Sequence, residues 1–345
     1  MKRRKGTYII AEAGVNHNGS LDVAKRLVEE AKRAGADAVK FQTFRAEKLV
    51  SRFAGKAEYQ KKTTASDESQ LEMIRKLELS ESDHVELMEL CRKRKIDFLS
   101  SPFDEESADL LERLGVAAYK IPSGEITNHP FLEHIAGKKK PMILSTGMSS
   151  LEEVEEAVAV IFSTGNAALT LLHCVTEYPA PVEEINLRAM ITMKEVFGLP
   201  VGYSDHTQGI EIAVAAVALG AQVIEKHFTL DRTMPGPDHK ASLEPSELLD
   251  MVKAIRSVEK ALGDGEKKPA PCEVKNMAIA RKSIVALKPI GAGEVINKKK
   301  IGIKRPGNGI QPKDLEKIIG LKAKRKIGQD EVITWEDLAP CRRRS

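Results

Sequence analysis

Two histidines occupy positions where neighbouring parallel strands are expected to end. His206 follows the apolar run Val201–Tyr203, and His227 ends the apolar run that begins at Val223. Between them, Gly209–Leu219 is rich in Ala, Ile and Val, which is typical of a helix packed on a sheet. Both strands of a parallel β-α-β unit end at the same edge, so the two imidazoles can converge. Either histidine alone could be an ordinary loop residue, but the pair favours a divalent metal site with open coordination positions.

Two lysines within other apolar stretches indicate a bound anion. Lys40 lies in Ala38–Phe41, and Lys120 lies in Ala117–Ile121. A buried ammonium group is costly unless it is paired, so both lysines are candidate ligands of an anion. Hydroxyl donors follow other apolar stretches at Ser101, Ser123 and Ser145, although each alone could belong to a turn or a helix cap. Together these side chains predict an oxyanion, such as phosphate or carboxylate, beside the metal.

These side chains need a scaffold, and the chain alternates apolar strands with helices. The expected strands are Tyr8–Ala13, Ala38–Phe41, Asp97–Ser100, Ala117–Ile121, Met142–Leu144, Leu169–His173, Val201–Tyr203 and Val223–His227. The expected helices include Leu21–Ala34, Ser82–Lys93, Glu105–Leu114, Pro130–Ala136, Leu151–Phe162, Leu187–Phe197, Gly209–Leu219 and Pro245–Leu262, and a polar excursion covers Arg45–Ser69. Eight β/α units in about 260 residues predict a TIM barrel, an α/β fold with its chemistry at the C-terminal ends of the strands.

All eight predicted strands end in, or are directly followed by, polar or ionisable residues, as a barrel enzyme requires. The set is Glu12; Lys40 and Gln42; Ser101; Lys120, Ser123 and Glu125; Ser145; Thr176 and Tyr178; Ser204 and His206; and Lys226 and His227. Loop polarity alone would supply some of these residues. The barrel nevertheless predicts that the whole set meets at one face of the molecule.

The alternation of strands and helices ends after Leu262. Residues 1–263 form the predicted barrel, and residues 264–282 contain the Gly, Pro and charge of a linker. From Ser283 onwards, the segments SIVALKPI, EVI, IGIKRPGNGI, LKAKRKI and EVIT predict a small β-rich domain over 283–345. Its turn Arg305–Ile310 is either a structural Gly-rich turn or a means of presenting Arg305 to an anionic or polar ligand.

Composition limits the classes of function. Of 345 residues, 42% are hydrophobic and 30% are charged, which predicts a soluble globular protein without a membrane span. Aromatic content is 4%, and basic runs such as Arg342–Arg344 lie mainly at the ends, so nucleic-acid binding is not expected. The cysteines, Cys91, Cys174, Cys272 and Cys341, lack metal-like or redox spacing, and we expect reduced thiols in a cytoplasmic protein.

Ten collinear motifs identify a family. They are IAEAGVNHNG at Ile10–Gly19, VKFQTF at Val39–Phe44, SSPFD at Ser100–Asp104, YKIPSGEI at Tyr119–Ile126, LSTGM at Leu144–Met148, HCVTEYPAP at His173–Pro181, GYSDHT at Gly202–Thr207, EKHFTLD at Glu225–Asp231, PGPDHKAS at Pro235–Ser242 and KRPGNGI at Lys304–Ile310. Over nearly its whole length the chain resembles the sialic acid synthases (N-acetylneuraminate synthases) of the bacterial nonulosonic acid synthase family. The resemblance includes their C-terminal antifreeze-like (SAF) domain.

The resemblance implies condensation of phosphoenolpyruvate (PEP) with the open-chain aldehyde of an N-acetylated hexosamine, with release of phosphate. His206 and His227 match manganese ligands. The positions that match PEP contacts are Lys40, Ser101, Lys120, Ser123, Ser145, Thr176 and Ser204. Those that match sugar contacts are Gln42, Glu125, Tyr178 and Asp238, and Arg305 matches an Arg that reaches the partner's site in a homodimer with exchanged C-terminal domains. Thr176 stands where neuraminate-forming members carry Asn, so the sugar is left open between N-acetylmannosamine and 2,4-diacetamido-2,4,6-trideoxymannose.

The implied chemistry agrees with the residue types. PEP is a trianion near neutral pH, which lysines and hydroxyl donors can accommodate, and a divalent metal polarises an aldehyde without proton transfer. Glu12 or Glu125 is a candidate general base, although Glu12 could instead be an ion-pair partner of Lys40. Two alternatives are another metal-dependent aldolase or hydrolase on the same barrel, and a non-catalytic role in surface or spore-coat polysaccharide assembly.

Overall fold

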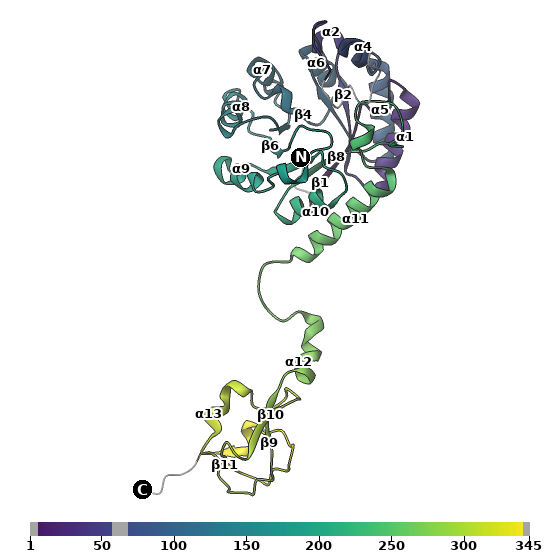
Figure 1. Cartoon of the computed structure of the whole chain (residues 1–345). Coiled ribbons are helices and arrows are strands. Elements are labelled where there is room, and N and C mark those ends of the chain that lie inside the picture. Colours follow the sequence, from purple (N-terminus) through teal and green to yellow (C-terminus); the bar gives the residue numbers. More distant parts are fainter. Residues whose placement is uncertain (1–5, 57–67, 341–345) are drawn as a thin grey trace. The chain divides into compact units, whose positions relative to one another are not determined.

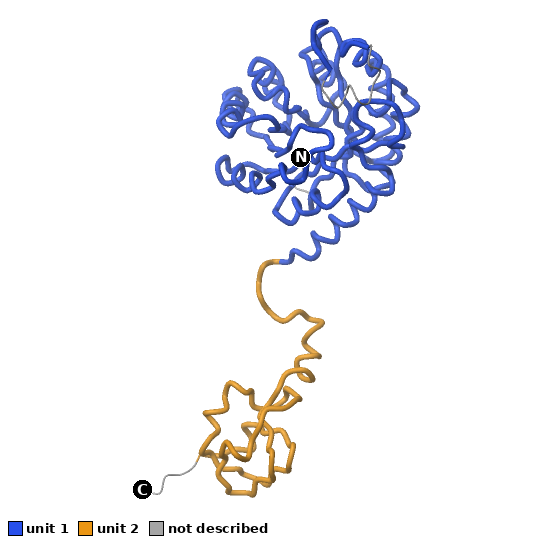
Figure 2. The backbone as a smooth tube through the Cα atoms, viewed as in Figure 1, with its two compact units in different colours: residues 1–263 blue, residues 264–345 orange. Residues whose placement is uncertain are grey.

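The chain forms two compact units, Met1–Gly263 and Asp264–Ser345, which Figure 2 distinguishes by colour. A computed structural model describes residues 6–56 and 68–340. Cys341, the basic residues 342–344 and part of the predicted polar excursion lie outside the described residues. No described helix combines the length and the apolar composition that a membrane crossing requires.

A parallel β-barrel forms the centre of the first unit (Figure 1). Within the described residues its eight strands are β1 (Tyr8–Gly14), β2 (Ala38–Thr43), β3 (Asp97–Pro102), β4 (Tyr119–Ile121), β5 (Met142–Ser145), β6 (Leu169–His173), β7 (Val201–Asp205) and β8 (Val223–His227). Their hydrogen-bonded order is β3-β2-β1-β8-β7-β6-β5-β4, and β3 also lies against β4, so the barrel is nearly closed. The predicted TIM-barrel fold is confirmed.

Helices surround this barrel in Figure 1. They are α1 (Leu21–Ala34), α5 (Glu81–Arg94), α6 (Glu105–Leu114), α7 (His129–Gly137), α8 (Leu151–Ser163), α9 (Ala189–Phe197), α10 (Glu211–Ala218) and α11 (Pro245–Leu262), with α2 (Ala46–Leu49) and α4 (Gln70–Arg75) between β2 and α5. The predicted helices are confirmed, with ends that shift by a few residues. Helix α1 shows why they begin and end where they do. Ser20 caps its first turn, and Gly35 ends it with φ of 84°, a conformation that glycine adopts without strain.

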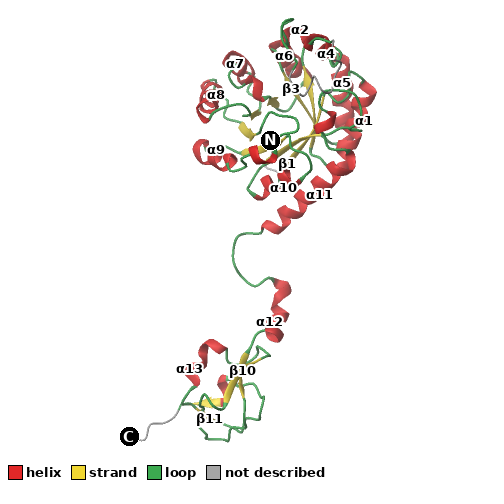
Figure 3. Ribbon diagram, in the orientation of Figure 1, coloured by secondary structure: helices red, strands yellow, loops and turns green. Residues whose placement is uncertain are grey.

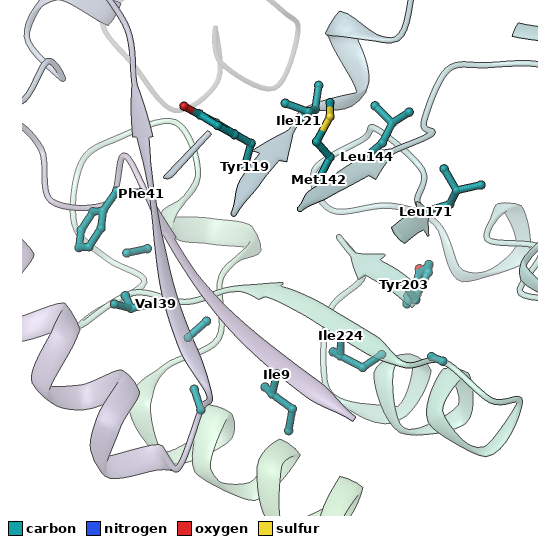
Figure 4. Packing of buried hydrophobic residues seen from close by; sticks show 14 of the residues in the cluster. Ile9, Val39, Phe41, Tyr119, Ile121, Met142, Leu144, Leu171, Tyr203 and Ile224 are labelled. Atoms are coloured by element: carbon teal, nitrogen blue, oxygen red, sulfur yellow. The ribbon is translucent and has the colours of Figure 1, made fainter. Parts of the chain in front are cut away.

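Alternate residues of each strand serve two different cores. Ile9, Val39, Phe41, Tyr119 and Ile224 belong to the layer between the barrel and its helices, part of which is drawn in Figure 4. The neighbouring strand positions form a second cluster of Tyr8, Ile10, Ala38, Leu99, Ala118, Ile143, Leu172 and Val223. Because side chains alternate along a strand, this second cluster faces the barrel interior and closes it below the strand ends.

The second unit is small and has its own core. Its antiparallel pairs are β9 (Ser283–Ala286) with β10 (Ile301–Lys304), and β11 (Lys322–Ala323) with β12 (Leu338–Ala339), as coloured in Figure 3. Short helices α12 (Val274–Ala280) and α13 (Leu315–Ile318) accompany them. The core consists mainly of isoleucines, namely Ile284, Ile290, Ile296, Ile301, Ile310, Ile318, Ile327 and Ile333.

Two strands predicted for this unit are not formed by its described residues. EVI and EVIT contribute only the isolated bridges Val295↔Lys322 and Val285↔Val332 instead of strands, because turns interrupt the ladder after one pair. Within the predicted linker, Val274–Ala280 is the helix α12, none of whose side chains is buried. The apolar residues of these segments are nevertheless used, since Ile296 and Ile333 lie in the core.

A buried ion pair joins β7 to β8 through the residues that directly precede the two histidines. Lys226 Nζ lies 2.8 Å from Asp205 Oδ2, and both side chains are fully buried. Lys226 Nζ also donates to the carbonyl oxygen of Thr207, while Asp205 Oδ1 accepts from the backbone N and Oγ1 of Thr207. Every polar atom of the pair therefore has a partner, which is the condition under which a buried charge is tolerated.

We expect the Asp205→Ala substitution to lower the free energy of unfolding by about 3–5 kcal/mol, because it leaves the Lys226 ammonium buried and without its counter-charge. The double substitution Asp205→Leu with Lys226→Met should cost less than Asp205→Ala alone, because neither charge remains. Urea unfolding of the first unit measures both effects. Glu86→Ala, at the exposed Lys25–Glu86 pair, is the control and should leave the midpoint nearly unchanged. A cost for Asp205→Ala as small as that of the control would contradict the prediction.

Candidate active site

A cavity of about 320 Å³ opens at the C-terminal ends of the barrel strands. Its lining includes thirteen residues predicted from the sequence: Glu12, Lys40, Gln42, Ser101, Lys120, Ser123, Ser145, Thr176, Tyr178, Ser204, His206, His227 and Asp238. These residues come from strands or loops that are far apart in the chain. The barrel therefore brings nearly all the candidate site residues to one cavity, as its topology requires.

Three candidate residues, Glu125, Arg305 and Lys226, are not among those that line this cavity. The prediction that Lys226 meets the others there is wrong, because its side chain lies on the other face of β8 and pairs with Asp205. Glu125 directly follows the lining residue Gly124, but it is half-buried, and its Oε2 accepts a hydrogen bond of 2.7 Å from Asn128 Nδ2. Arg305 belongs to the second unit, where its Nε donates to the carbonyl oxygen of Ala280 at 3.1 Å. The sugar-binding roles of both residues, and the catalytic role of Glu125, stay predictions.

The polar floor of the cavity follows directly from strand alternation. Seven of the eight residues of the interior cluster are followed two positions later by a cavity-lining residue: Ile10 by Glu12, Ala38 by Lys40, Leu99 by Ser101, Ala118 by Lys120, Ile143 by Ser145, Leu172 by Cys174 and Val223 by Glu225. Residues two apart point to the same side of a strand. The site is thus one layer of polar side chains stacked on a layer of apolar ones.

Four charges of alternating sign lie in this polar layer. Lys40 Nζ is 2.8 Å from Glu12 Oε2 and 3.7 Å from Glu225 Oε2, and Lys120 Nζ is 3.1 Å from Glu225 Oε1. Lys40 also donates to Ser101 Oγ at 3.0 Å, and all four charged side chains are almost completely buried. The ion pairing predicted as the alternative role of Glu12 is therefore present.

Glu225 is a charged residue of the site that the sequence analysis missed. The sequence pattern points to its neighbours Lys226 and His227, yet alternation places Glu225 in the barrel and Lys226 outside it. Burial raises the pKa of Glu225, but Lys120 and Lys40 outweigh burial and lower that pKa to about 2. Burial raises the pKa of Glu12 to about 7, although Lys40 opposes the change. The two carboxyl groups therefore differ in proton affinity, and Glu12 can exchange a proton near neutral pH.

Two buried hydroxyl groups beside the lysines have no hydrogen-bond partner within the described part of the chain. They are Ser145 Oγ and Thr176 Oγ1. Gly147 allows this arrangement, because a Cβ atom there would lie 2.3 Å from Thr176 Oγ1 and 2.9 Å from Ser123 Oγ. The Gly147 amide instead donates to Ser123 Oγ at 2.9 Å. Since buried polar groups are normally satisfied, these hydroxyls are expected to bind a polar ligand.

The two predicted histidines lie side by side in the cavity. Their ring centroids are 5.7 Å apart, and the Tyr178 ring lies 4.3 Å from that of His206 and 5.5 Å from that of His227. His206 Nδ1 is 2.6 Å from the carbonyl oxygen of Val175. Because a carbonyl can only accept, Nδ1 carries the proton and Nε2 keeps its lone pair.

The histidines also have the properties that a divalent metal requires. Burial lowers the pKa of His206 to about 4 and that of His227 well below its usual value, so both imidazoles are neutral at physiological pH. His227 Nδ1 is buried and without a hydrogen-bond partner in the described residues. Among the same residues there is no group of three or more His, Cys, Asp or Glu side chains that could hold a metal ion. A metal here would thus have two imidazole ligands and open positions.

Asp238 is held in the cavity by the loop after β8. Asn18 Nδ2 donates to the carbonyl oxygen of Pro235 at 2.8 Å, and Ser242 Oγ donates to the backbone carbonyl oxygen of Asp238 at 2.7 Å. Burial raises the pKa of the Asp238 carboxyl group to about 6, although Lys40 opposes the change. Asn18, which belongs to the motif Ile10–Gly19, thus helps to position this loop.

One side of the cavity was not predicted. Val15, Phe44, Leu49, Met73, Ile74, Leu77, Phe103 and Met148 also line it, and five of them come from the segment between β2 and α5. The predicted polar excursion, Arg45–Ser69, contains only Leu49 of these five residues. The five are scattered along the segment, and the sequence pattern does not show that they meet at the cavity.

Comparison with known proteins identifies the family. Residues 27–267 match the NeuB family, and residues 281–339 match the SAF domain. The chain belongs to the NeuB family. This NeuB-family protein is 56% identical over 331 residues to N,N'-diacetyllegionaminic acid synthase of Campylobacter jejuni, covering 95% of this chain and 99% of the relative. It is 49% identical over 335 residues to the synthase of the same name from Legionella pneumophila, covering 96% and 94%.

Solved structures of relatives agree with this membership. The crystal structure of N-acetylneuraminic acid synthetase from Leptospira borgpetersenii is 38% identical, covers 79% of this chain and 90% of its own, and superposes with a TM-score of 0.71. A spore coat polysaccharide biosynthesis protein E from Chromobacterium violaceum is 27% identical, with a TM-score of 0.75 over 96% of this NeuB-family chain and 99% of its own. The predicted family, barrel and SAF domain are therefore confirmed.

We expect Asp238→Asn to stabilise the protein at pH 8 but not at pH 4. The folded state holds the Asp238 proton to about pH 6, whereas the ordinary pKa of 3.8 applies after unfolding. Wild-type stability therefore falls as the pH rises through this window, because the buried group must ionise. The free energy of unfolding of the variant should exceed that of the wild type at pH 8 by on the order of 2 kcal/mol.

Urea unfolding of both proteins at the two pH values measures this difference. The other titrating groups are common to both proteins and cancel in the comparison. An equal difference between variant and wild type at pH 4 and pH 8 would contradict a raised pKa of Asp238.

Proposed function

We propose that this protein is a nonulosonic acid synthase, an enzyme that condenses PEP with the open-chain aldehyde of an N-acetylated hexosamine and releases phosphate. The observation that carries the proposal is the convergence of Lys40 and Lys120 with unpaired hydroxyl groups beside two neutral histidines. Membership of the NeuB family and the names of its closely similar relatives support the same reaction.

PEP is assigned to the polar floor of the cavity. Lys40 and Lys120 supply positive charge, and Ser101, Ser123, Ser145, Thr176 and Ser204 supply hydroxyl donors for its carboxylate and phosphate. The hydroxyls of Ser145 and Thr176 are available without breaking any hydrogen bond that the described residues make. Glu12 and Glu225 hold the two lysines in place through the ion pairs described above.

His206 and His227 are assigned to a divalent metal, most simply manganese. When bound, that ion supplies Lewis acidity to the aldehyde oxygen of the sugar. The Val175 carbonyl fixes the orientation of His206, a common arrangement around metal-ligating histidines. Gln42, Tyr178 and Asp238 line the same cavity and are assigned to the hydroxyl and amide groups of the sugar.

The reaction then follows from the placement of these groups. The PEP double bond supplies the electron pair that bonds its methylene carbon to the aldehyde carbon, and the aldehyde oxygen gains a proton. Water adds to the former enol carbon and loses one proton. The hydroxyl group so formed then gives up its remaining proton and becomes the keto group of the product as the carbon–oxygen bond to phosphate breaks and phosphate leaves. Glu12, with a pKa of about 7, can hold or release the transferred proton at neutral pH, and Glu125 is the second candidate.

Between the two candidate sugars, we propose 2,4-diacetamido-2,4,6-trideoxymannose over N-acetylmannosamine. Both relatives named above as N,N'-diacetyllegionaminic acid synthases are more similar to this chain than the human N-acetylneuraminate-9-phosphate synthase, which is 38% identical. Thr176, in place of the Asn of neuraminate-forming members, agrees with a changed substrate.

We place the enzyme in the cytoplasm, where PEP is available. Cys91, Cys174 and Cys272 are free thiols, which agrees with a reducing compartment. Recovery of the protein outside the cytoplasmic fraction would overturn this assignment.

We further propose a homodimer in which Arg305 of each protomer reaches the cavity of the other. Supporting this assignment, Arg305 lies on an exposed turn of a separate compact unit, and the resembling family exchanges this domain. An exchange of this kind would let a single Arg complete a site that its own barrel does not.

The proposed function is tested by phosphate release from PEP in the presence of manganese and each of the two sugars. We expect release to require both PEP and a sugar, and to stop when a chelator removes the metal. Neither an aldolase or hydrolase of other substrates nor a non-catalytic protein would release phosphate under these conditions. Full activity of metal-free enzyme would overturn the metal assignment alone.

His206→Ala and His227→Ala should each lower turnover by at least 100-fold, because a single imidazole cannot hold the metal productively. Both variants should keep the unfolding transition of the wild type. His129→Ala is the matched control, since His129 lies at the start of α7 and does not line the cavity. Manganese binding measured by calorimetry should be lost in the two site variants and kept in the control.

Exchange of the C-terminal domains is tested by mixing two inactive proteins. Arg305→Ala and His227→Ala subunits should each be inactive, but a mixed dimer should regain part of the activity, because one of its two sites has both residues. Native mass spectrometry verifies that mixed dimers form. Verified mixed dimers without recovered activity would rule out the exchange.

A further inference from the structure

One side of the cavity is made of hydrocarbon, in contrast to its polar floor. We call it the apolar wall, and it consists of Phe44, Leu49, Met73, Ile74, Leu77 and Phe103. The floor residues belong to the barrel strands or follow them directly, whereas most of the wall comes from the segment around α2 and α4. The cavity thus has a charged part and an uncharged part.

The apolar wall is a packed structure. The Phe44 and Phe103 rings meet edge to face, with centroids 6.2 Å apart and an interplanar angle of 84°. Phe44, Leu77 and Val15 form a buried cluster against which Leu49, Ile74 and Phe103 pack. A capping box at Ser69 fixes the start of helix α4, which presents Met73 and Ile74 to the cavity.

Several charged side chains of the same segment form ion pairs and are not among the residues that line the cavity. Arg75 pairs with Glu47, Lys48 with Glu106, and Arg45 with Glu78. In the described parts of the segment, every side chain that lines the cavity is apolar. A sugar hydroxyl placed against the apolar wall would therefore find no hydrogen-bond partner among the wall side chains that the structure describes.

We infer that the apolar wall selects the sugar by a methyl group at carbon 6. The inference rests on the proposed function, which places the reacting aldehyde carbon beside PEP at the polar floor. The far end of the sugar chain, which carries carbon 6, is the part left to contact the wall. A methyl group there gains by leaving water, whereas a hydroxyl group loses its hydrogen bonds to water without replacement.

The test compares N-acetylmannosamine with its 6-deoxy analogue, two sugars that differ by one oxygen atom at carbon 6. With saturating PEP and manganese, kcat/KM of the wild type should favour the 6-deoxy sugar by on the order of 10- to 100-fold, the range open to an apolar pocket. A ratio near one, with both sugars releasing phosphate, overturns the inference and leaves the proposed function intact. No phosphate release with either sugar or with the diacetamido sugar overturns both.

Variants of helix α4 test whether the apolar wall causes the preference for the 6-deoxy sugar. Met73→Gln keeps the length of the side chain and adds a hydrogen-bonding group, so the kcat/KM ratio should fall about tenfold towards N-acetylmannosamine. Ile74→Gln should lower the kcat/KM ratio in the same direction. Because Ile74 is only half-buried, this variant can be tested even if Met73→Gln does not fold. Leu71→Gln is the matched control, since Leu71 is half-buried in α4 but does not line the cavity. An unchanged ratio in a folded wall variant, or an equal fall in the control, would overturn the assignment.

Discussion

The ion pairs among Lys40, Glu12, Glu225 and Lys120 are the interaction on which the cavity depends. A lysine inside a barrel is stable only if a carboxylate lies beside it, and each carboxylate needs a lysine in return. Strands β1, β2, β4 and β8 each contribute one of the four charges, so the network fixes the relative positions of those strand ends. Each lysine thus has a carboxyl partner, which lets the charged floor be buried.

The stabilising parts of the barrel are separate from its polar floor, which explains how the protein tolerates such a site. The apolar interior cluster below the floor and the layer beneath the helices supply the hydrophobic stabilisation. The floor contains groups that burial disfavours, including Asp238 and the unpaired hydroxyls of Ser145 and Thr176. Functional sites commonly retain features of this kind, which are unfavourable in the empty protein and become favourable when a ligand binds.

The sequence predicted those parts of the molecule that depend on local periodicity. Strand alternation and helix patterns identified the barrel, and the polar residues after each strand identified most of the cavity. Glu225 does not stand out in the sequence, because Lys226 and His227 beside it are equally able to do chemistry and only the alternation of β8 decides which side chains face inward. The apolar wall could not be predicted, because its residues meet only through the path of a long connection. In the second unit, the segments EVI and EVIT have strand-like composition but pair over a single residue, which composition does not reveal.

The two-residue offset between the interior cluster and the floor has a consequence for how this protein can vary. Inserting or deleting one residue within a barrel strand would turn every later side chain of that strand to the opposite face. A catalytic group would then point at a helix, and an apolar residue would enter the cavity. The same alternation of side chains thus sets both the core and the active site along each strand. Changes of length can therefore accumulate in the connecting segments but not in the strands. The segment that builds the apolar wall is such a connection, and substrate preference can diverge there while the floor stays the same.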